Sequence, residues 1–131
     1  MAQRIDSLGM FEAAAAVPEQ IETAIATAHA VEGLPDGEQI DNVLVLGMGG
    51  SGVSGDLLAH SAGPFMPVPV VVVKGYEPPS YVNERTLVFA MSFSGNTEET
   101  LEAVSTAANA GGRIVAVTQG GALGDACRAS G

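Results

Sequence analysis

Four short, continuous apolar runs constrain the fold of this 131-residue chain more than any other feature. The runs cover residues 42–46, 68–73, 86–91 and 113–118, with Pro69 as the only interruption. Continuous rather than alternating hydrophobicity is typical of strands that are buried on both faces, as in parallel sheets. Helical segments separate most of these runs, over about 51–62, 96–110 and 120–129. Strands alternating with helices predict an α/β fold, a three-layer sandwich around a mostly parallel, doubly wound sheet.

A helical segment precedes the first run. Residues 7–31 show helical spacing of apolar side chains, with Ser7 as the expected cap and Pro18 opening a second helix. We therefore expect residues 1–37 to form an N-terminal helical segment and residues 38–131 to form the α/β domain. A doubly wound sheet normally returns with another strand after its last helix, so we expect this domain to be truncated before its last strand.

Charge and cysteine content exclude several classes of protein. Fifteen acids against five bases give a formal net charge of −10, which disfavours a nucleic-acid-binding surface. Cys127 is the single cysteine, so neither an internal disulfide nor a cysteine-based zinc site can form. The N-terminus does not have the pattern of a signal peptide, and the apolar runs are too short to span a bilayer. We expect a cytoplasmic protein that binds neither nucleic acid nor membranes.

The first loop, residues 47–52, has the sequence GMGGSG between the first run and a predicted helix. Glycines let an anion approach the main chain closely, and the next helix directs unpaired N–H groups and a positive dipole at the same point. Ser51 adds a hydroxyl donor. The pattern predicts an anion site, most simply for a phosphate.

The second loop, residues 92–100, has the sequence SFSGNTEET and follows the third run. We expect Ser94, Asn96 or Thr97 to cap the next helix, with Glu98 or Glu99 completing the cap. Capping alone does not require the hydroxyls of Ser92, Ser94 and Thr97 together, and these suit the oxygens of a phosphate monoester. In a parallel sheet both loops emerge at the carboxyl ends of strands, where open α/β sheets bind ligands.

The first loop also satisfies the dinucleotide fingerprint through Gly47, Gly49 and Gly52. Such a domain needs an acid after its second strand for the ribose, whereas Lys74 stands there. A lysine could serve a 2′-phosphate, so an NADP-binding redox domain remains an alternative. The hydroxyl-rich second loop has no role in that alternative.

The pairing of GMGGSG with SFSGNTEET resembles the sugar isomerase (SIS) domain, which is Rossmann-like. The N-terminal GMFEAAAAVPEQIETAI and the segment VVVKGYEPPSYV make the resemblance strongest to the bifunctional phosphoglucose/phosphomannose isomerases, in their N-terminal part. This resemblance implies two SIS domains per subunit, a homodimer, and phosphate-binding residues that match Gly49, Gly50, Ser51, Ser92, Ser94 and Thr97.

The resemblance implies interconversion of glucose 6-phosphate or mannose 6-phosphate with fructose 6-phosphate through an enediol, without metal or redox cofactor. The family's catalytic glutamate, histidine and lysine, with a stabilising arginine, match positions beyond Gly131. We therefore expect no catalytic residue in this span. The other candidates are expected to pack, to cap or to face solvent; these are His29, His60, Lys74, Glu98, Glu99 and Cys127.

A non-catalytic alternative is a sugar-phosphate-sensing SIS module of the kind found in transcriptional regulators. Such a module would bind its ligand through the same two loops. It would also adjoin a DNA-binding segment, and the leading helices show no basic recognition face. Sequence beyond Gly131 distinguishes the two, because only the isomerase requires a second half that supplies histidine and glutamate.

Overall fold

The computed structural model describes residues 6–130. The chain divides into two compact units, residues 1–34 and 35–131. In the described part of the first unit, α1 spans Met10–Ala15 and α2 spans Val17–His29. Pro18 lies in the first turn of α2, where its missing N–H costs no hydrogen bond.

The predicted Ser7 cap is wrong. The carboxylate of Asp6 instead accepts hydrogen bonds from the backbone N–H groups of Met10 (2.8 Å) and Phe11 (2.9 Å). These two bonds lower the pKa of Asp6. A carboxylate has two acceptor oxygens and suits the positive end of a helix, so it satisfies two free N–H groups where a serine would satisfy one.

The second unit contains a four-stranded sheet. Its strands are β1 (Asn42–Gly47), β2 (Val70–Val73), β3 (Thr86–Met91) and β4 (Arg113–Val117). Their order in the sheet is β2-β1-β3-β4 and every pairing is parallel. The prediction of a parallel, doubly wound α/β fold is confirmed. β2 lies on one side of β1 and β3 on the other, so the direction of winding reverses between β2 and β3.

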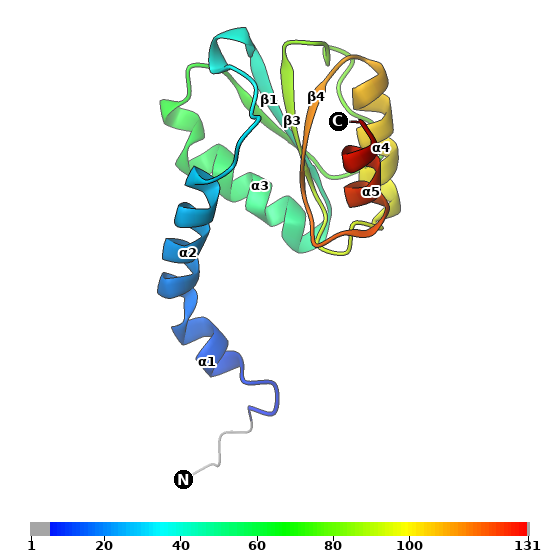
Figure 1. Ribbon diagram of the computed structural model, residues 1–131. Coiled ribbons are helices and arrows are strands. Elements are labelled where there is room, and N and C mark those ends of the chain that lie inside the picture. The colour runs from blue at the N-terminus through cyan, green and yellow to red at the C-terminus, as the bar shows by residue number, and fades with distance from the viewer. Residues whose placement is uncertain (1–5, 131) are drawn as a thin grey trace. The chain divides into compact units, whose positions relative to one another are not determined.

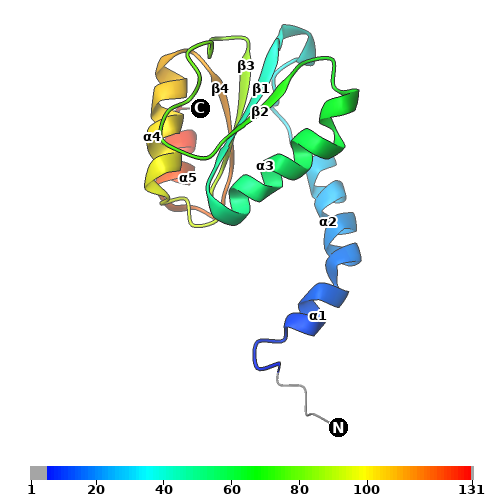
Figure 2. The ribbon, with the colours of Figure 1, turned by 180° about the vertical axis from the view of Figure 1, so that it is seen from behind.

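Helices lie on both faces of this sheet (Figures 1 and 2). On one face α3 (Gly49–Ser61) packs on β1 and β2, and on the other lie α4 (Glu98–Asn109) and α5 (Gly121–Ser130). Two 3₁₀ turns, η1 (Gly37–Gln39) and η2 (Gly63–Phe65), precede β1 and follow α3. The connection from β2 to β3 is irregular, and within it Val82 is buried against the core.

The core lies between the sheet and α4. Leu44 and Leu46 of β1 and Val88 of β3 are almost fully buried against Ala103 and Ala107 of α4. On the opposite face, Gly55 lets α3 approach the sheet closely, since a Cβ there would lie 2.8 Å from a methyl of Val45. Small residues on the helices thus allow both layers to lie close to the branched side chains of β1.

Candidate functional site

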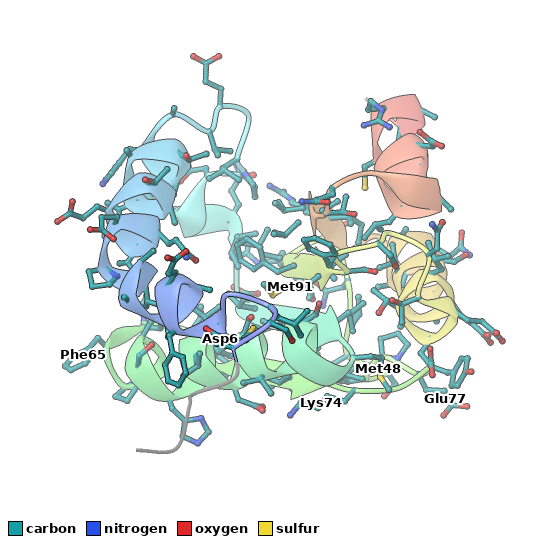
Figure 3. All side chains as sticks on the ribbon, turned by 90° about the horizontal axis from the view of Figure 1, so that it is seen from below. Asp6, Met48, Phe65, Lys74, Glu77 and Met91 are labelled. Atoms are coloured by element: carbon teal, nitrogen blue, oxygen red, sulfur yellow. The ribbon has the colours of Figure 1, made fainter. Side chains whose placement is uncertain are left out.

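The two glycine- and hydroxyl-rich loops leave neighbouring strands at the same edge of the sheet. Gly47, the last residue of β1, is the register partner of Met91, the last residue of β3. Figure 3 looks onto this edge, with Met48 beside the start of α3 and Met91 at the end of β3. The prediction that both loops emerge together at the carboxyl edge is therefore confirmed.

The first loop forms the first turn of α3, which begins at Gly49, about two residues earlier than predicted. Gly49 adopts φ +50°, a left-handed conformation that other residues reach only with strain. The N–H of Gly52 donates to the carbonyl of Met48, but those of Gly49, Gly50 and Ser51 have no acceptor among the described residues. The Ser51 hydroxyl likewise has no partner in the described part of the chain, so this helix start offers four free donors.

The second loop is held by its own hydroxyls. Ser92 is only 3% exposed, and its Oγ accepts from the N–H of Gly95 (3.1 Å) and hydrogen-bonds with Thr97 Oγ1 (2.9 Å). Ser94 is exposed, and its Oγ accepts from the N–H of Asn96 (3.2 Å). Ser92 thus positions Thr97, whereas Ser94 lies open to solvent.

The predicted side-chain cap on α4 is wrong. Thr97 occupies the N-cap position, but no side chain of the described residues accepts a hydrogen bond from the start of α4, and the Thr97 hydroxyl instead hydrogen-bonds with Ser92 Oγ. The N–H groups of Glu98, Glu99 and Thr100 therefore have no partner in residues 6–130. An uncapped helix start next to hydroxyl groups is a favourable place for an anion.

Asn96 caps a different helix. Its Oδ1 accepts from the N–H of Ala122 in α5 (3.0 Å), and its Nδ2 donates to the carbonyl of Ser94 (3.2 Å). The Gly95 carbonyl also accepts from the N–H of Leu123 (2.9 Å). The second loop is thereby joined to the start of α5, a connection that the sequence analysis did not predict.

An open pocket of about 600 Å³ adjoins the first loop. It lies beside the carboxyl ends of β1, β3 and β4 and shares Gly50 and Ser51 with the start of α3. Its lining comprises Met48, Gly50, Ser51, Ser54, Met91, Phe93, Val117, Thr118 and Gln119. Ser92, Ser94 and Thr97 do not line it, so the second loop reaches this pocket through Phe93 alone.

Sequence analysis missed the contribution of the turn after β4. Thr118 and Gln119 line the pocket, and their segment emerges at the same edge as the two predicted loops. The signal was present, because TQGG follows an apolar run just as the other loops do. The rule that parallel sheets bind ligands at the carboxyl ends of strands applies equally to this third connection.

The electrostatics of this edge are mixed. Lys74 is exposed, as expected, and its ammonium pairs with the Asp56 carboxylate of α3. Across the edge, loss of hydration and then the charges of Glu98 and neighbouring acids of α4 raise the pKa of Tyr76. Free N–H groups and hydroxyls, rather than unpaired cations, are therefore the groups that this edge offers to an anion.

The two histidines and the cysteine lie in places that give them no part in the site. His60 Nδ1 lies 2.7 Å from the Asp56 carbonyl of its own helix, and His29 is exposed at the end of α2. Cys127 is half-buried and packs against the core. Within residues 6–130 no cluster of three His, Cys, Asp or Glu side chains could hold a metal ion. No helix in that range is long and apolar enough to cross a membrane.

Known proteins are similar to this chain in sequence and in fold. The chain is 42% identical over 114 residues to a bifunctional phosphoglucose/phosphomannose isomerase of Caldicellulosiruptor bescii, covering 87% of this chain and 34% of that protein. It is 32% identical over 99 residues to a D-glucosamine-6-phosphate 4-epimerase of Sulfolobus acidocaldarius, covering 75% of this chain and 31% of that protein. The expected similarity to the bifunctional isomerases is confirmed, and the chain spans about a third of the length of these relatives.

The fold agrees with that of a Clostridium difficile protein assigned as a phosphosugar isomerase, at a TM-score of 0.60 and 20% identity over 66% of this chain and 26% of that one. A model of the SIS domain matches residues 38–127, which include both loops and the four strands. This chain therefore belongs to the SIS domain family.

Proposed function

We propose that this chain binds the phosphate group of a sugar phosphate between the first turns of α3 and α4. The observation that carries the proposal is the juxtaposition of two uncapped helix starts, because β1 and β3 are neighbours. Free N–H groups and the hydroxyls of Ser51, Ser94 and Thr97 provide the donors that a phosphate dianion needs. Gly49 and Gly50 leave the backbone open to the anion, and Ser92 contributes from the buried side of the second loop.

The reaction that we propose for the whole protein is reversible aldose–ketose isomerisation, an intramolecular oxidoreduction. It would interconvert glucose 6-phosphate or mannose 6-phosphate with fructose 6-phosphate, as the names of most of the similar proteins suggest. The residues described here would hold the phosphate at one end of the sugar, which orients the carbons that exchange a proton at the other. We further propose that a last strand, a second SIS domain with the catalytic groups, and a homodimer complete that protein.

Amide chemical shifts test the phosphate site directly. Titrating the ¹⁵N-labelled chain with fructose 6-phosphate should shift the signals of Gly49, Gly50 and Ser51 and of Ser94 to Thr97. Free fructose at the same concentration should leave them in place. Equal shifts with both sugars would contradict a phosphate site, and no shift with the phosphate ester would also contradict it.

An assay of isomerase turnover distinguishes phosphate binding from catalysis. The 131-residue chain should show no isomerase activity, because the candidate residues in residues 6–130 bind an anion and do not move a proton. Measurable turnover in a coupled assay, absent from a Ser51→Ala control, would place catalytic groups within this chain. The alternative of a sugar-phosphate sensor predicts binding without turnover even in the complete protein.

A further inference from the structure

The pocket beside the first loop contains polar groups that phosphate binding does not use. Gln119 is exposed, lines the pocket, and its carboxamide has no hydrogen-bond partner among the described residues. Its neighbour Thr118 differs, because the Thr118 hydroxyl accepts from the N–H of Gly120 (3.2 Å) and donates to the Gly120 carbonyl (2.9 Å). Of these two side chains, only that of Gln119 can therefore donate a hydrogen bond to a ligand.

The backbone fixes Gln119 independently of its side chain. Its N–H donates to the carbonyl of Phe93 in the second loop (3.2 Å), and the adjacent strand end is held by the bond from the Ser92 N–H to the Val117 carbonyl (3.1 Å). A substitution at Gln119 that keeps the backbone leaves both bonds in place. The side chain thus extends from an anchored position beside the pocket.

Ser54 contributes from α3. It follows Ser51 by three residues, so both lie on one face of the helix, and both line the pocket. The Ser54 hydroxyl donates to the Gly50 carbonyl (3.3 Å), which leaves its oxygen free to accept another hydrogen bond. The pocket therefore extends from Ser51 in the first turn of α3 to a second hydroxyl, that of Ser54.

We propose that this pocket holds the polyol chain of the bound phosphate ester and that Gln119 is a specificity-determining residue which hydrogen-bonds its hydroxyls. A carboxamide presents one acceptor and two donors, which match neighbouring hydroxyl groups that both donate and accept. The apolar lining from Met48, Met91 and Val117 suits the C–H faces of a sugar. A volume of about 600 Å³ is ample for a hexose. This inference rests on the proposed phosphate site. It adds where the polyol chain attached to that phosphate would lie.

The test compares two ligands on one variant of the full 131-residue chain. Calorimetric or NMR titrations of Gln119→Met with fructose 6-phosphate should show affinity about three- to tenfold lower than for the unchanged chain, the loss expected for one or two neutral hydrogen bonds. Affinity for inorganic phosphate should stay the same, because the donors proposed for phosphate belong to the first turns of α3 and α4, whereas Gln119 follows β4. Gln20→Met, the same chemical change in α2, should alter neither affinity.

The outcomes separate this inference from the proposed function. Unchanged fructose 6-phosphate affinity in Gln119→Met, or an equal loss for both ligands, would overturn the role of Gln119 and leave the phosphate site standing. Failure of the unchanged chain to bind either ligand would overturn the phosphate site and this inference with it. If Gln119→Met does not fold, Ser54→Ala serves instead. It should weaken fructose 6-phosphate two- to threefold without affecting phosphate, and no difference between the ligands would overturn the polyol pocket.

Discussion

The side-chain oxygen Oδ1 of Asn96 lies 3.0 Å from the backbone nitrogen of Ala122, so a residue of the second loop caps α5. The same side chain donates through Nδ2 to the Ser94 carbonyl (3.2 Å). The side-chain amide of Asn96 therefore both shapes the second loop and joins this loop to α5. The backbone of the exposed Ser94 is held by this connection.

Asn96→Ala should destabilise the chain by about 1 kcal/mol, because an N-cap acceptor is lost and the start of α5 frays. Asn96→Asp should retain most of the stability, since a carboxylate accepts from the same N–H and suits the helix dipole. Urea unfolding measures both. Asn109→Ala, at the exposed end of α4, is the matched control and should lie within error of the unchanged chain. A loss in Asn96→Asp as large as in Asn96→Ala would contradict the cap.

Ser51→Ala should weaken binding of fructose 6-phosphate by about 1–3 kcal/mol, because its free hydroxyl would donate to a charged ligand. Ser94→Ala should weaken binding by a similar amount if its hydroxyl reaches the phosphate from the second loop. Isothermal titration calorimetry gives the affinities. Ser105→Ala, on the exposed side of α4, is the control. If the affinity for fructose 6-phosphate is unchanged in both site variants, the Ser51 and Ser94 hydroxyls do not bind the phosphate.

The fold was predictable from the sequence because its strands are continuous apolar runs and its turns contain glycine. The buried pattern of β1, with every residue from Val43 to Gly47 buried, is what such a run predicts. Element ends differ by up to three residues, as at α1, which starts at Met10 instead of 7, and at β2, which starts at Val70 instead of 68. Pro69 explains the difference at β2, since it has no N–H to donate to a neighbouring strand.

The polar details of the site were less predictable, because several partners compete for each hydroxyl and amide. Thr97 stands at the N-cap position of α4, but its hydroxyl bonds with the buried Ser92 and caps none of the N–H groups of α4. Proximity in sequence makes Asn96 one of three candidate caps of α4, whereas its Oδ1 caps α5 at Ala122, 26 residues further along the chain. Local spacing identifies residues able to cap, but the tertiary contact between the second loop and the turn after β4 decides which helix receives the bond.

Gly95→Ala should be strongly destabilising. A Cβ at Gly95 would lie 1.8 Å from the Gly120 carbonyl oxygen, and the residue adopts φ +68°, which alone costs other residues about 1–2 kcal/mol. The contact is with backbone, so relief requires the second loop and the turn after β4 to separate. Gly37→Ala is the control, since its Cβ would meet nothing within 4 Å. A thermal midpoint for Gly95→Ala equal to that of the control would show that the two loops are not packed as described.

The ion pair between Asp41 and Arg85 should make stability depend on pH. Arg85 Nε lies 2.6 Å from Asp41 Oδ2, a bond that joins the segments before β1 and β3 and lowers the pKa of Asp41. Because the carboxyl has a lower pKa when folded than when unfolded, its contribution is present above the unfolded value near 4 and is lost as pH falls through the folded value.

Asp41→Asn should therefore lower the thermal midpoint modestly at pH 7. The difference from the unchanged chain should shrink as the pH falls below the unfolded value near 4 and through the lower folded value, because the carboxyl is then protonated in both states. Both groups are exposed, so the effect should also shrink in 1 M salt. Asp125→Asn, in the exposed pair of α5, is the control, since that pair joins residues within one helix turn and not two strands. A difference between Asp41→Asn and the unchanged chain that stays the same as the pH is lowered from 7 through the acid range would show that the carboxylate charge is not the stabilising group.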